Sequence, residues 1–255
     1  MDRSRKEKVR EILLSKPFTS LQELIEKFPN VSSMTLRRDI EYFEEKGEVI
    51  KVRGGARAMH FITRTLEDSY YKRALENPDG KEKIATAAAH FIETGRSIFL
   101  DSGSTIARIV PHLPYTRLNI TTTDPNVALA LVKNEQAVVN ITGGSLNRSN
   151  LSLSGNMALK FVENTNLDIA FVSPSGFSLE CGFTSGNFNE SVLKNAVTMK
   201  SHRVIMLVQS GKFNKSMPHT FATLQDIDVL ITDEEPGDEI RKACEEAKVE
   251  LIVTD

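Results

Sequence analysis

The chain has 255 residues, of which 40% are hydrophobic and 26% are charged, a composition typical of globular proteins that excludes the disordered and collagen-like classes. Its longest aliphatic run, residues 127–132, is far shorter than the roughly 20 residues that a membrane span requires. The charged N-terminus lacks the apolar core of a signal peptide, and two cysteines are too few for a disulfide framework or a cysteine-rich zinc site. We therefore expect a soluble cytoplasmic protein.

Charge is unevenly distributed along the chain. Residues 1–57 contain 13 Lys and Arg against 10 Asp and Glu, a net charge of +3, whereas the whole chain carries −2. A basic head on an acidic body indicates different partners for the two parts, with an anionic partner for the head.

Two helices are predicted in the first 30 residues. Val9, Ile12 and Leu13 recur at helical spacing among basic residues. The second helix opens with the sequence Ser-Leu-Gln-Glu at residues 20–23, a capping box in which the Ser20 hydroxyl accepts from the amide three residues later. The following Pro29 disfavours helical geometry in the residue before it and ends the helix.

A third helix is expected after a tight turn, capped by Ser32 or Ser33 and running to about residue 46, with Gly47 as its stop. Leu36, Ile40 and Phe43 are spaced for a buried stripe, which leaves hydroxyls and adjacent arginines on the other faces. Two helices joined by a tight turn, with such residues in the first turns of the second, are typical of a recognition helix in the major groove.

A basic strand over residues 49–53 follows and ends at Gly54-Gly55, which is typical of a wing that contacts phosphates. The head, residues 1–57, is therefore predicted to be a winged helix-turn-helix. The alternative is a three-helix bundle with a solvated charged face. The expected DNA-contacting residues are Ser32, Ser33, Thr35, Arg37, Arg38, Lys51 and Arg53.

Two sequence segments of the head are similar to a known family signature. Residues 31–40, Val-Ser-Ser-Met-Thr-Leu-Arg-Arg-Asp-Ile, and residues 53–56, Arg-Gly-Gly-Ala, resemble the N-terminal signature of the DeoR family of bacterial transcription regulators. One departure is Lys-Val-Arg at residues 51–53, where Arg-x-His is commoner. The wing stays basic, so DNA binding remains what the resemblance implies.

The body, residues 81–255, follows a linker predicted at residues 58–80 and alternates helical and strand patterns. Such alternation predicts an α/β domain with a mostly parallel sheet covered on both faces, in which ligands bind at the carboxyl ends of the strands. Strands are expected at 97–100, 118–122, 138–142, 167–172, 204–208, 229–232 and 251–253. Helices are expected at 84–92, 106–113, 127–132, 158–162, 190–199 and 239–247.

The end of the first of these strands carries Asp101, Ser102, Gly103, Ser104 and Thr105 and leads into a predicted helix. Small residues let backbone amides approach an anion, the hydroxyls add donors, and a helix N-terminus adds a partial positive charge. We expect this loop to hold a phosphate, with the aspartate accepting from a ligand hydroxyl. The alternative is an ordinary strand-to-helix turn.

Polar groups at other strand ends complete the expected pocket. Glu190 and Lys194, at i and i+4 on one helix face, fit either this pocket or a surface ion pair. The further effector-binding candidates are Thr122, Asp124, Gly143, Gly144, Ser175, Gly176, Lys194 and Lys212.

The body also resembles the effector domain of the DeoR family, which is itself similar to ribose-5-phosphate isomerase. The resemblance implies a phosphorylated sugar as inducer, bound by the Asp101 loop. We also expect a homo-oligomer, because a single winged helix-turn-helix covers only one half-site of a symmetric operator. The sequence does not distinguish a dimer from a tetramer, although the resemblance implies that tetramers are common. Thr123, Pro174 and Gln209 depart from the usual family residues, so the identity of the sugar does not follow.

Two functions compete at this point. The first is a DNA-binding regulator, released from its operator by a sugar phosphate and most simply a repressor. The second is a sugar-phosphate isomerase with an appended helical domain, for which Asp101, Asp124 or Glu190 would supply the base. No dedicated acid–base constellation can be read from the spacing, and the five histidines form no metal-ligand pattern. We therefore expect a regulator with no catalytic residues, no metal and no cofactor.

Overall fold

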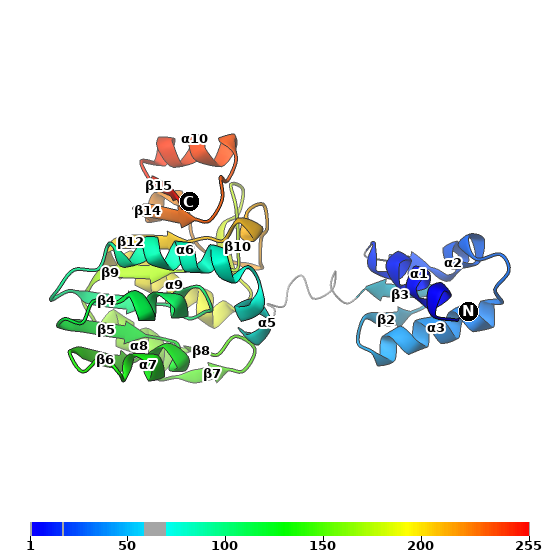
Figure 1. Ribbon diagram of the computed structural model, residues 1–255, viewed down its shortest axis with the longest axis horizontal. Helices are drawn as coiled ribbons and strands as arrows, with labels where there is room; N and C mark the ends of the chain where they lie inside the picture. The colour runs from blue at the N-terminus through cyan, green and yellow to red at the C-terminus, as the bar shows by residue number, and fades with distance from the viewer. Residues whose placement is uncertain (1, 17, 59–69, 255) are drawn as a thin grey trace. The chain divides into compact units, whose positions relative to one another are not determined.

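The computed structural model describes residues 2–16, 18–58 and 70–254, and its contacts divide the chain into two compact units, residues 1–66 and 67–255 (Figure 1). In the described part, no helix is both long enough and apolar enough to cross a membrane. Residues 59–69 of the predicted linker lie outside the described residues.

The described residues of the N-terminal unit form three helices and a small antiparallel sheet of order β1-β3-β2. Ser20 caps the second helix by accepting from the Glu23 amide at 3.1 Å, as predicted. The other half of the capping box does not form, because the Glu23 carboxylate pairs instead with Lys16. The elements are α1 (Asp2–Leu14), β1 (Phe18–Ser20), α2 (Leu21–Lys27), α3 (Ser33–Glu45), β2 (Val49–Val52) and β3 (Gly55–Ala58).

The third helix begins and ends where its sequence predicts. Ser32 is its N-cap and accepts from the Thr35 amide at 3.2 Å, and Gly47 takes the left-handed backbone that follows the helix. The predicted stripe of Leu36, Ile40 and Phe43 is buried in the core of this unit.

The wing is a hairpin whose first strand, β2, ends at Val52, just before the turn that leads into the glycine pair. Gly54, at φ +88°, makes the turn, and Gly55 already belongs to β3. A Cβ on Gly55 would collide with the backbone oxygen of Thr19, so β1 and β3 can pair closely only with glycine there.

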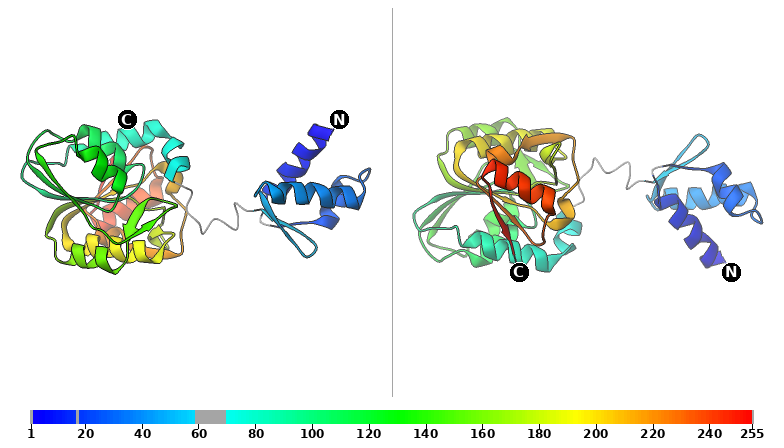
Figure 2. Two further views of the ribbon diagram at one scale, coloured as in Figure 1. Left: turned by 90° about the horizontal axis from the view of Figure 1, so that it is seen from below. Right: turned by 90° about the horizontal axis from the view of Figure 1, so that it is seen from above.

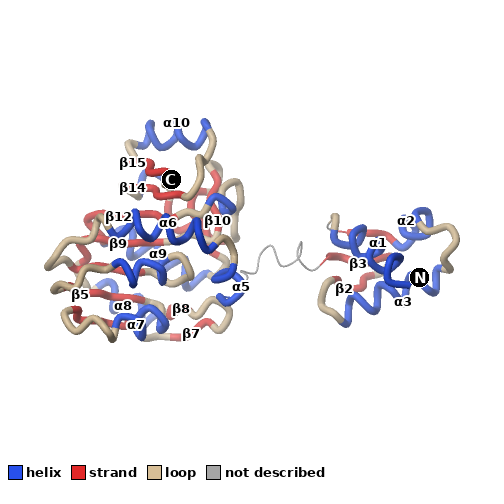
Figure 3. The backbone as a smooth tube through the Cα atoms, in the orientation of Figure 1, coloured by secondary structure: helices blue, strands red, loops and turns tan. Residues whose placement is uncertain are grey.

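The C-terminal unit is built on a parallel sheet of order β15-β14-β12-β9-β4-β5-β6, as the alternation of helices and strands predicts (Figure 3). Its strands are β4 (Ser97–Leu100), β5 (Leu118–Thr122), β6 (Ala137–Ile141), β9 (Leu167–Val172), β12 (Ser201–Leu207), β14 (Val229–Thr232) and β15 (Glu250–Val253).

Helices cover both faces of this sheet (Figure 2). One face packs against α6 (Pro78–Ala89), the 3₁₀ helix η2 (Ile106–His112) and α7 (Pro125–Leu131). The other packs against α8 (Asn156–Glu163), α9 (Phe188–Lys200) and α10 (Asp238–Ala247). The buried side chains of these strands are mostly apolar, as expected for parallel strands that are covered on both sides.

Several short elements differ from the prediction. The helix expected at 106–113 is a 3₁₀ helix that contains Pro111. The predicted linker is partly helical, since it contains α5 (Tyr70–Leu75), and α6 begins at Pro78 rather than at residue 84. Some further short strands of the C-terminal unit were not predicted, since a run of three or four residues gives only a weak periodic signal. These are β7 (Ser145–Asn147) with β8 (Ser152–Ser154), and the antiparallel sheet of β10 (Gly176–Ser178), β11 (Gly182–Ser185) and β13 (His219–Ala222).

Candidate functional site

The start of α3 presents the predicted recognition surface. Arg37 and Arg38 are exposed and point away from the buried stripe of the helix, as do Ser32 and Ser33. The Ser32 hydroxyl lies 2.9 Å from the Thr35 hydroxyl, so these two side chains bind each other and shape the first turn. The side chains of two arginines and two serines are therefore accessible near the N-terminal end of α3.

The wing is tied to this helix by Lys51. Its ammonium forms an ion pair of 2.5 Å with Glu41, and its amide donates to Glu44 at 2.8 Å. Arg37 and Lys51 line the same shallow hollow between α3 and the wing. Arg53, at the tip of the hairpin, is exposed. Lys51 thus fixes the wing against the helix as well as adding positive charge beside it.

A second ion pair fixes the back of α3, and the sequence analysis did not anticipate it. Asp39 is buried on the inner face of the helix and pairs with Arg5 of α1 at 3.3 Å. A buried carboxylate in the middle of an apolar stripe is the signal that could have indicated this contact. The pair holds the recognition helix to α1 in one orientation.

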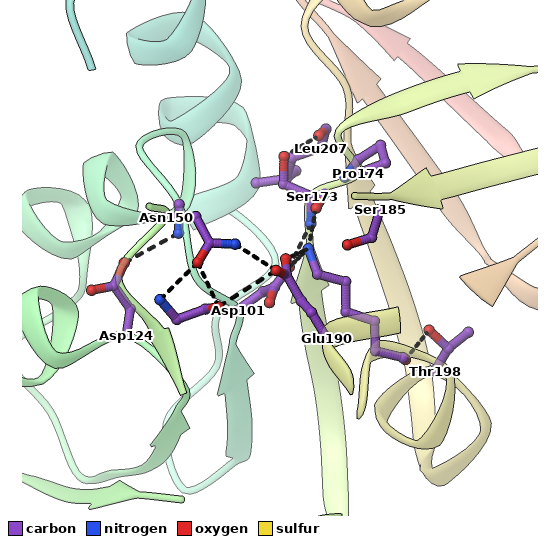
Figure 4. A network of polar contacts seen from close by, with 12 residues as sticks. Asp101, Asp124, Asn150, Ser173, Pro174, Ser185, Glu190, Thr198 and Leu207 are labelled. Carbon is purple, nitrogen blue, oxygen red and sulfur yellow. Dashed lines mark hydrogen bonds and ion pairs between the residues drawn. The ribbon is translucent and has the colours of Figure 1, made fainter. Parts of the chain in front are cut away.

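In the C-terminal unit, polar groups converge at the carboxyl ends of the strands, as the alternation of elements predicts. Asp101 follows β4, and its Oδ2 accepts from the amide of Ser173, which follows β9, at 3.1 Å. The same oxygen lies 2.8 Å from Nζ of Lys194, on α9. Figure 4 shows Asp101, Ser173 and Glu190 meeting from different elements.

Lys194 and Glu190 belong to this buried network and are not a surface ion pair. Both side chains are almost fully buried, at 4% and 6% exposure, and their charged atoms lie 3.2 Å apart. The ammonium also donates to the backbone oxygen of Ser173 at 2.6 Å. One cation therefore lies between two buried carboxylates and a carbonyl, which compensates for the removal of its charge from water.

Asn150 and Ser152, which the sequence analysis missed, complete the network from the β7–β8 hairpin. The Asn150 amide nitrogen donates to Glu190 Oε2 at 2.5 Å, while its oxygen accepts from the Ser152 hydroxyl at 2.8 Å. Both residues are buried. Asn150 and Glu190 are 40 residues apart in the sequence, so no local motif predicts the hydrogen bond between them.

Asp124 binds and orients the backbone of the Asp101 loop, residues 101–105. Its carboxylate accepts from the amide of Gly103 at 3.1 Å and from the amide of Asn126 at 2.8 Å, so it also caps α7. Burial raises the pKa of the Asp124 carboxyl, and the bonds from these backbone amides partly oppose that rise. Thr122, whose hydroxyl accepts from the Asp124 amide at 3.0 Å, supports the same turn.

The loop itself exposes little side-chain surface. Ser102, Ser104 and Thr105 are all less than a tenth exposed, and Gly103 has φ +124°, a backbone that favours glycine. Because η2 is a short 3₁₀ helix, the dipole expected behind the loop is weaker than that of an α-helix. Nearby, the Thr123 hydroxyl is buried and has no hydrogen-bond partner within the described residues.

The remaining candidates divide into one side chain and four backbone positions. Lys212 reaches the same strand ends and donates to the hydroxyl of Ser173 at 2.9 Å and to the oxygen of Pro174. Gly144 and Gly176 allow close backbone approach, because a Cβ would meet the carbonyl oxygens of Ser154 and Lys215, respectively. Gly143 turns with φ +69°, and Ser175 pairs through its amide with β11.

These contacts define what the site can do chemically. The carboxylates of Asp101 and Glu190 can accept hydrogen bonds from hydroxyl groups, while loop amides and lysines can bind an anion. No cluster of three or more potential metal ligands occurs among the residues that the structure describes.

Two family models match the chain. One describes the DeoR-like helix-turn-helix domain and matches residues 5–61, and the other describes the DeoR C-terminal sensor domain and matches residues 76–234. Among curated relatives, the HTH-type transcriptional regulator IolR of Bacillus subtilis is 31% identical, over 95% of this chain and 96% of its own length. The glycerol-3-phosphate regulon repressor of Escherichia coli is 26% identical, over 94% of each chain.

Among solved structures, ribose 5-phosphate isomerase A from Methanocaldococcus jannaschii matches with a TM-score of 0.40 and 18% identity, over 54% of this chain and 55% of its own. A sor operon regulator from Shigella flexneri matches with a TM-score of 0.39 and 13% identity, over 54% of this chain and 78% of its own.

Proposed function

The chain belongs to the DeoR family of DNA-binding transcriptional regulators, and we propose on that premise that a phosphorylated sugar controls its hold on operator DNA. The family is one of regulators and not of enzymes, so the isomerase alternative is not favoured. DNA binding is the task of the N-terminal unit, where α3 and the wing supply the contacts.

The buried network of Asp101, Lys194 and Glu190 is the observation that supports a sugar effector most directly. Carboxylates already held in place can exchange a protein partner for ligand hydroxyls without new ordering of side chains. The amides of Ser102, Ser104 and Thr105 and the ammonium of Lys212 lie at the same strand ends and would bind the phosphate. The Thr123 hydroxyl, which has no hydrogen-bond partner in the described part of the chain, is a further donor in this region.

We expect the effector to release the operator, which makes the protein a repressor. The E. coli relative is named for a glycerol-3-phosphate regulon, which supports a small phosphorylated polyol or sugar as the class of effector. The relatives named above are regulators of bacteria, whose chromosomal DNA lies in the cytoplasm, and we propose that this protein acts there as well.

A panel of compounds tests this proposal. It contains glycerol 3-phosphate, ribose 5-phosphate, phosphorylated hexoses, the same compounds without phosphate, and inorganic phosphate. At least one phosphorylated compound should raise the melting temperature and weaken binding to an operator selected from random DNA duplexes. If none does both, or if a hit is converted to product at a useful rate, the proposal is wrong.

The exposed edge of the sheet supports a homo-oligomer. β6 is an edge strand, and its Val138 and Ile141 are 59% and 44% exposed. Leu129 of the neighbouring α7 and Val132, which directly follows that helix, are about 70% exposed. An uncharged edge strand beside an apolar helix face invites pairing with another strand, and two copies of β6 related by a two-fold axis would pair antiparallel. We propose that a second copy covers this surface.

Sedimentation of Val138→Lys with Leu129→Lys tests the location of this interface. We expect dissociation of the double variant, while Met199→Lys, at another exposed apolar position, should leave the oligomer intact. A double variant that sediments like the wild type would exclude β6 as the interface.

A further inference from the structure

The helix α5 connects the effector domain to the DNA-binding unit. Its first residue, Tyr70, follows directly on residues 59–69, which lead back to the winged helix-turn-helix. Any signal that passes along the chain between the units must pass through α5. The contacts at the two ends of this short helix therefore determine how it can respond to changes in the effector domain.

The N-terminus of α5 is held by the hairpin that also supplies the network. The Tyr70 amide donates to the backbone oxygen of Ser149 at 2.8 Å. The next residue, Asn150, binds Glu190 of the network at 2.5 Å. A single peptide unit thus separates a side chain that binds the buried carboxylate from a carbonyl that binds α5.

The C-terminus of α5 is held by a buried cation. Lys81 of α6 is 2% exposed, and its ammonium donates to the backbone oxygens of Arg73 and Glu76, the latter at 2.6 Å. Cations at a helix C-terminus satisfy carbonyls that have no partner inside the helix. Lys81 anchors this end of α5 to α6 rather than to solvent.

The start of α6 is in turn bound to the strand ends. Asn77 caps α6 with a left-handed backbone of φ 40°, and its amide nitrogen donates to Asp233, after β14, at 2.7 Å. Asp233 also accepts from the amide of Ser210, which lies two residues before Lys212 in the sequence. Both ends of α5 therefore connect, through one or two bonds, to the edge of the sheet where the effector is proposed to bind.

We propose that α5 is the element that transmits effector binding to the DNA-binding unit, with Asn150–Ser149 and Lys81 as its two connections. The proposal rests on the effector site proposed above. When a ligand competes for Glu190, Asn150 loses or changes its partner, the Ser149 carbonyl shifts, and α5 moves or frays at Tyr70. An effector can change DNA affinity only through such a difference between two states.

Two substitutions at one position isolate the first connection. Tyr70→Pro deletes the N–H that binds Ser149, and proline is tolerated in the first turn of a helix. Tyr70→Ala removes the side chain but keeps the N–H. With the phosphorylated compound that releases wild-type protein from its operator, we expect Tyr70→Pro to bind with unchanged affinity but to release the operator about fivefold less than Tyr70→Ala. Equal release by both variants would overturn the proposal.

A ligand-free measurement keeps the test independent of the effector. Glu190→Ala removes the acceptor of Asn150, and we expect hydrogen exchange of the Tyr70 amide to accelerate at least about fivefold. The Val204 amide, which binds Asp228 at 2.7 Å, should be unaffected and controls for global destabilisation. Glu163→Ala, at an exposed site on α8, is the matched control. Unchanged exchange at Tyr70 in Glu190→Ala, or in Glu190→Met if the alanine variant fails to fold, would also overturn the proposal, because neither side chain offers Asn150 an oxygen acceptor.

The two proposals fail in different ways. If no compound stabilises the protein or releases DNA, the effector site is wrong, and the exchange measurement still decides whether the network reaches α5. If a compound releases wild type and Tyr70→Pro alike, the effector site stands and α5 does not transmit the signal. Lys81→Met tests the second connection in the same way, with exposed Lys83→Met as its control.

Discussion

Nζ of Lys194 lies 2.8 Å from Oδ2 of Asp101, and this contact joins the end of β4 to the helix α9 inside the domain. Since both side chains are almost fully buried, neither charge can be left without the other at low cost. The ion pair therefore stabilises the packing of α9 against the end of β4 and also lies at the centre of the proposed effector site. Any ligand that enters must keep this charge balance or supply its own.

Lys194→Met should be strongly destabilising, because it leaves the carboxylates of Asp101 and Glu190 buried without their cation. We expect a loss of about 3–5 kcal/mol in the free energy of unfolding, measured by urea denaturation of the C-terminal transition. Adding Asp101→Asn should restore part of the loss, since one uncompensated charge disappears. Lys160→Met, on the exposed face of α8, is the control and should change stability little. A mild effect of Lys194→Met would contradict the burial of the charge.

Gly103→Val should abolish the effector response and preserve DNA binding. No atom lies within 4 Å of the position of an added Cβ, so the cost of the substitution comes from the backbone, at φ +124°. Such strain amounts to about 1–3 kcal/mol and would displace the loop amides from the phosphate. Operator titrations with and without the phosphorylated compound measure the response.

Gly237→Val is the matched control for that experiment. Gly237 has φ +93° and equally open surroundings, but it precedes α10 and contributes to no contact of the network. It should lose similar stability and keep the effector response. If both variants respond to the ligand like the wild type, the Asp101 loop does not bind the phosphate.

Arg37→Ala and Arg38→Ala should each weaken operator binding, by roughly 1–3 kcal/mol where the side chain reads a base with two hydrogen bonds. An arginine that contacts only phosphate should weaken binding to all sequences alike. Binding to the selected operator and to a scrambled duplex separates the two cases. Arg10→Ala on α1 is the control. Near-normal affinity of the double variant Arg37→Ala/Arg38→Ala would exclude α3 as the recognition helix.

The sequence was sufficient for features that depend on neighbouring residues. The cap at Ser20, the cap at Ser32 and the stripe through Ile40 are local patterns of hydroxyl and apolar residues, and the structure confirms them. The parallel sheet was predictable for the same reason, since each strand and helix carries its own period.

What the sequence could not reveal depends on contacts between distant segments. Glu190 and Lys194 alone fit a surface ion pair equally well, because only the arrival of Asp101 and Asn150 makes the pair a buried network. In the same way, the sequence around Lys81 is that of an ordinary exposed lysine on a helix, and only the packing of α5 against α6 shows that its ammonium is buried. Short strands such as β10 form only because a partner strand lies beside them.

The buried Lys81 should also make stability depend on pH. Removal from water lowers the pKa of its ammonium from 10.5 to about 8. Below pH 8 the lysine is charged in both the folded and unfolded states, and burial disfavours the folded state by a constant amount. Between pH 8 and 10.5 the unfolded chain binds more protons, so the contribution of Lys81 to the free energy of unfolding rises with pH.

The comparison of wild type with Lys81→Met reveals this contribution. The difference in the free energy of unfolding, wild type minus variant, should increase by about 1–3 kcal/mol as the pH rises from 8 to 10.5. The neutral amine still has two N–H donors, enough for the carbonyls of Arg73 and Glu76, so the anchor of α5 survives deprotonation. Urea denaturation across this range measures the difference, and Lys83→Met, at an exposed site, should give a flat one. A flat difference for Lys81→Met as well would mean that its ammonium is solvated and does not hold α5 from the interior.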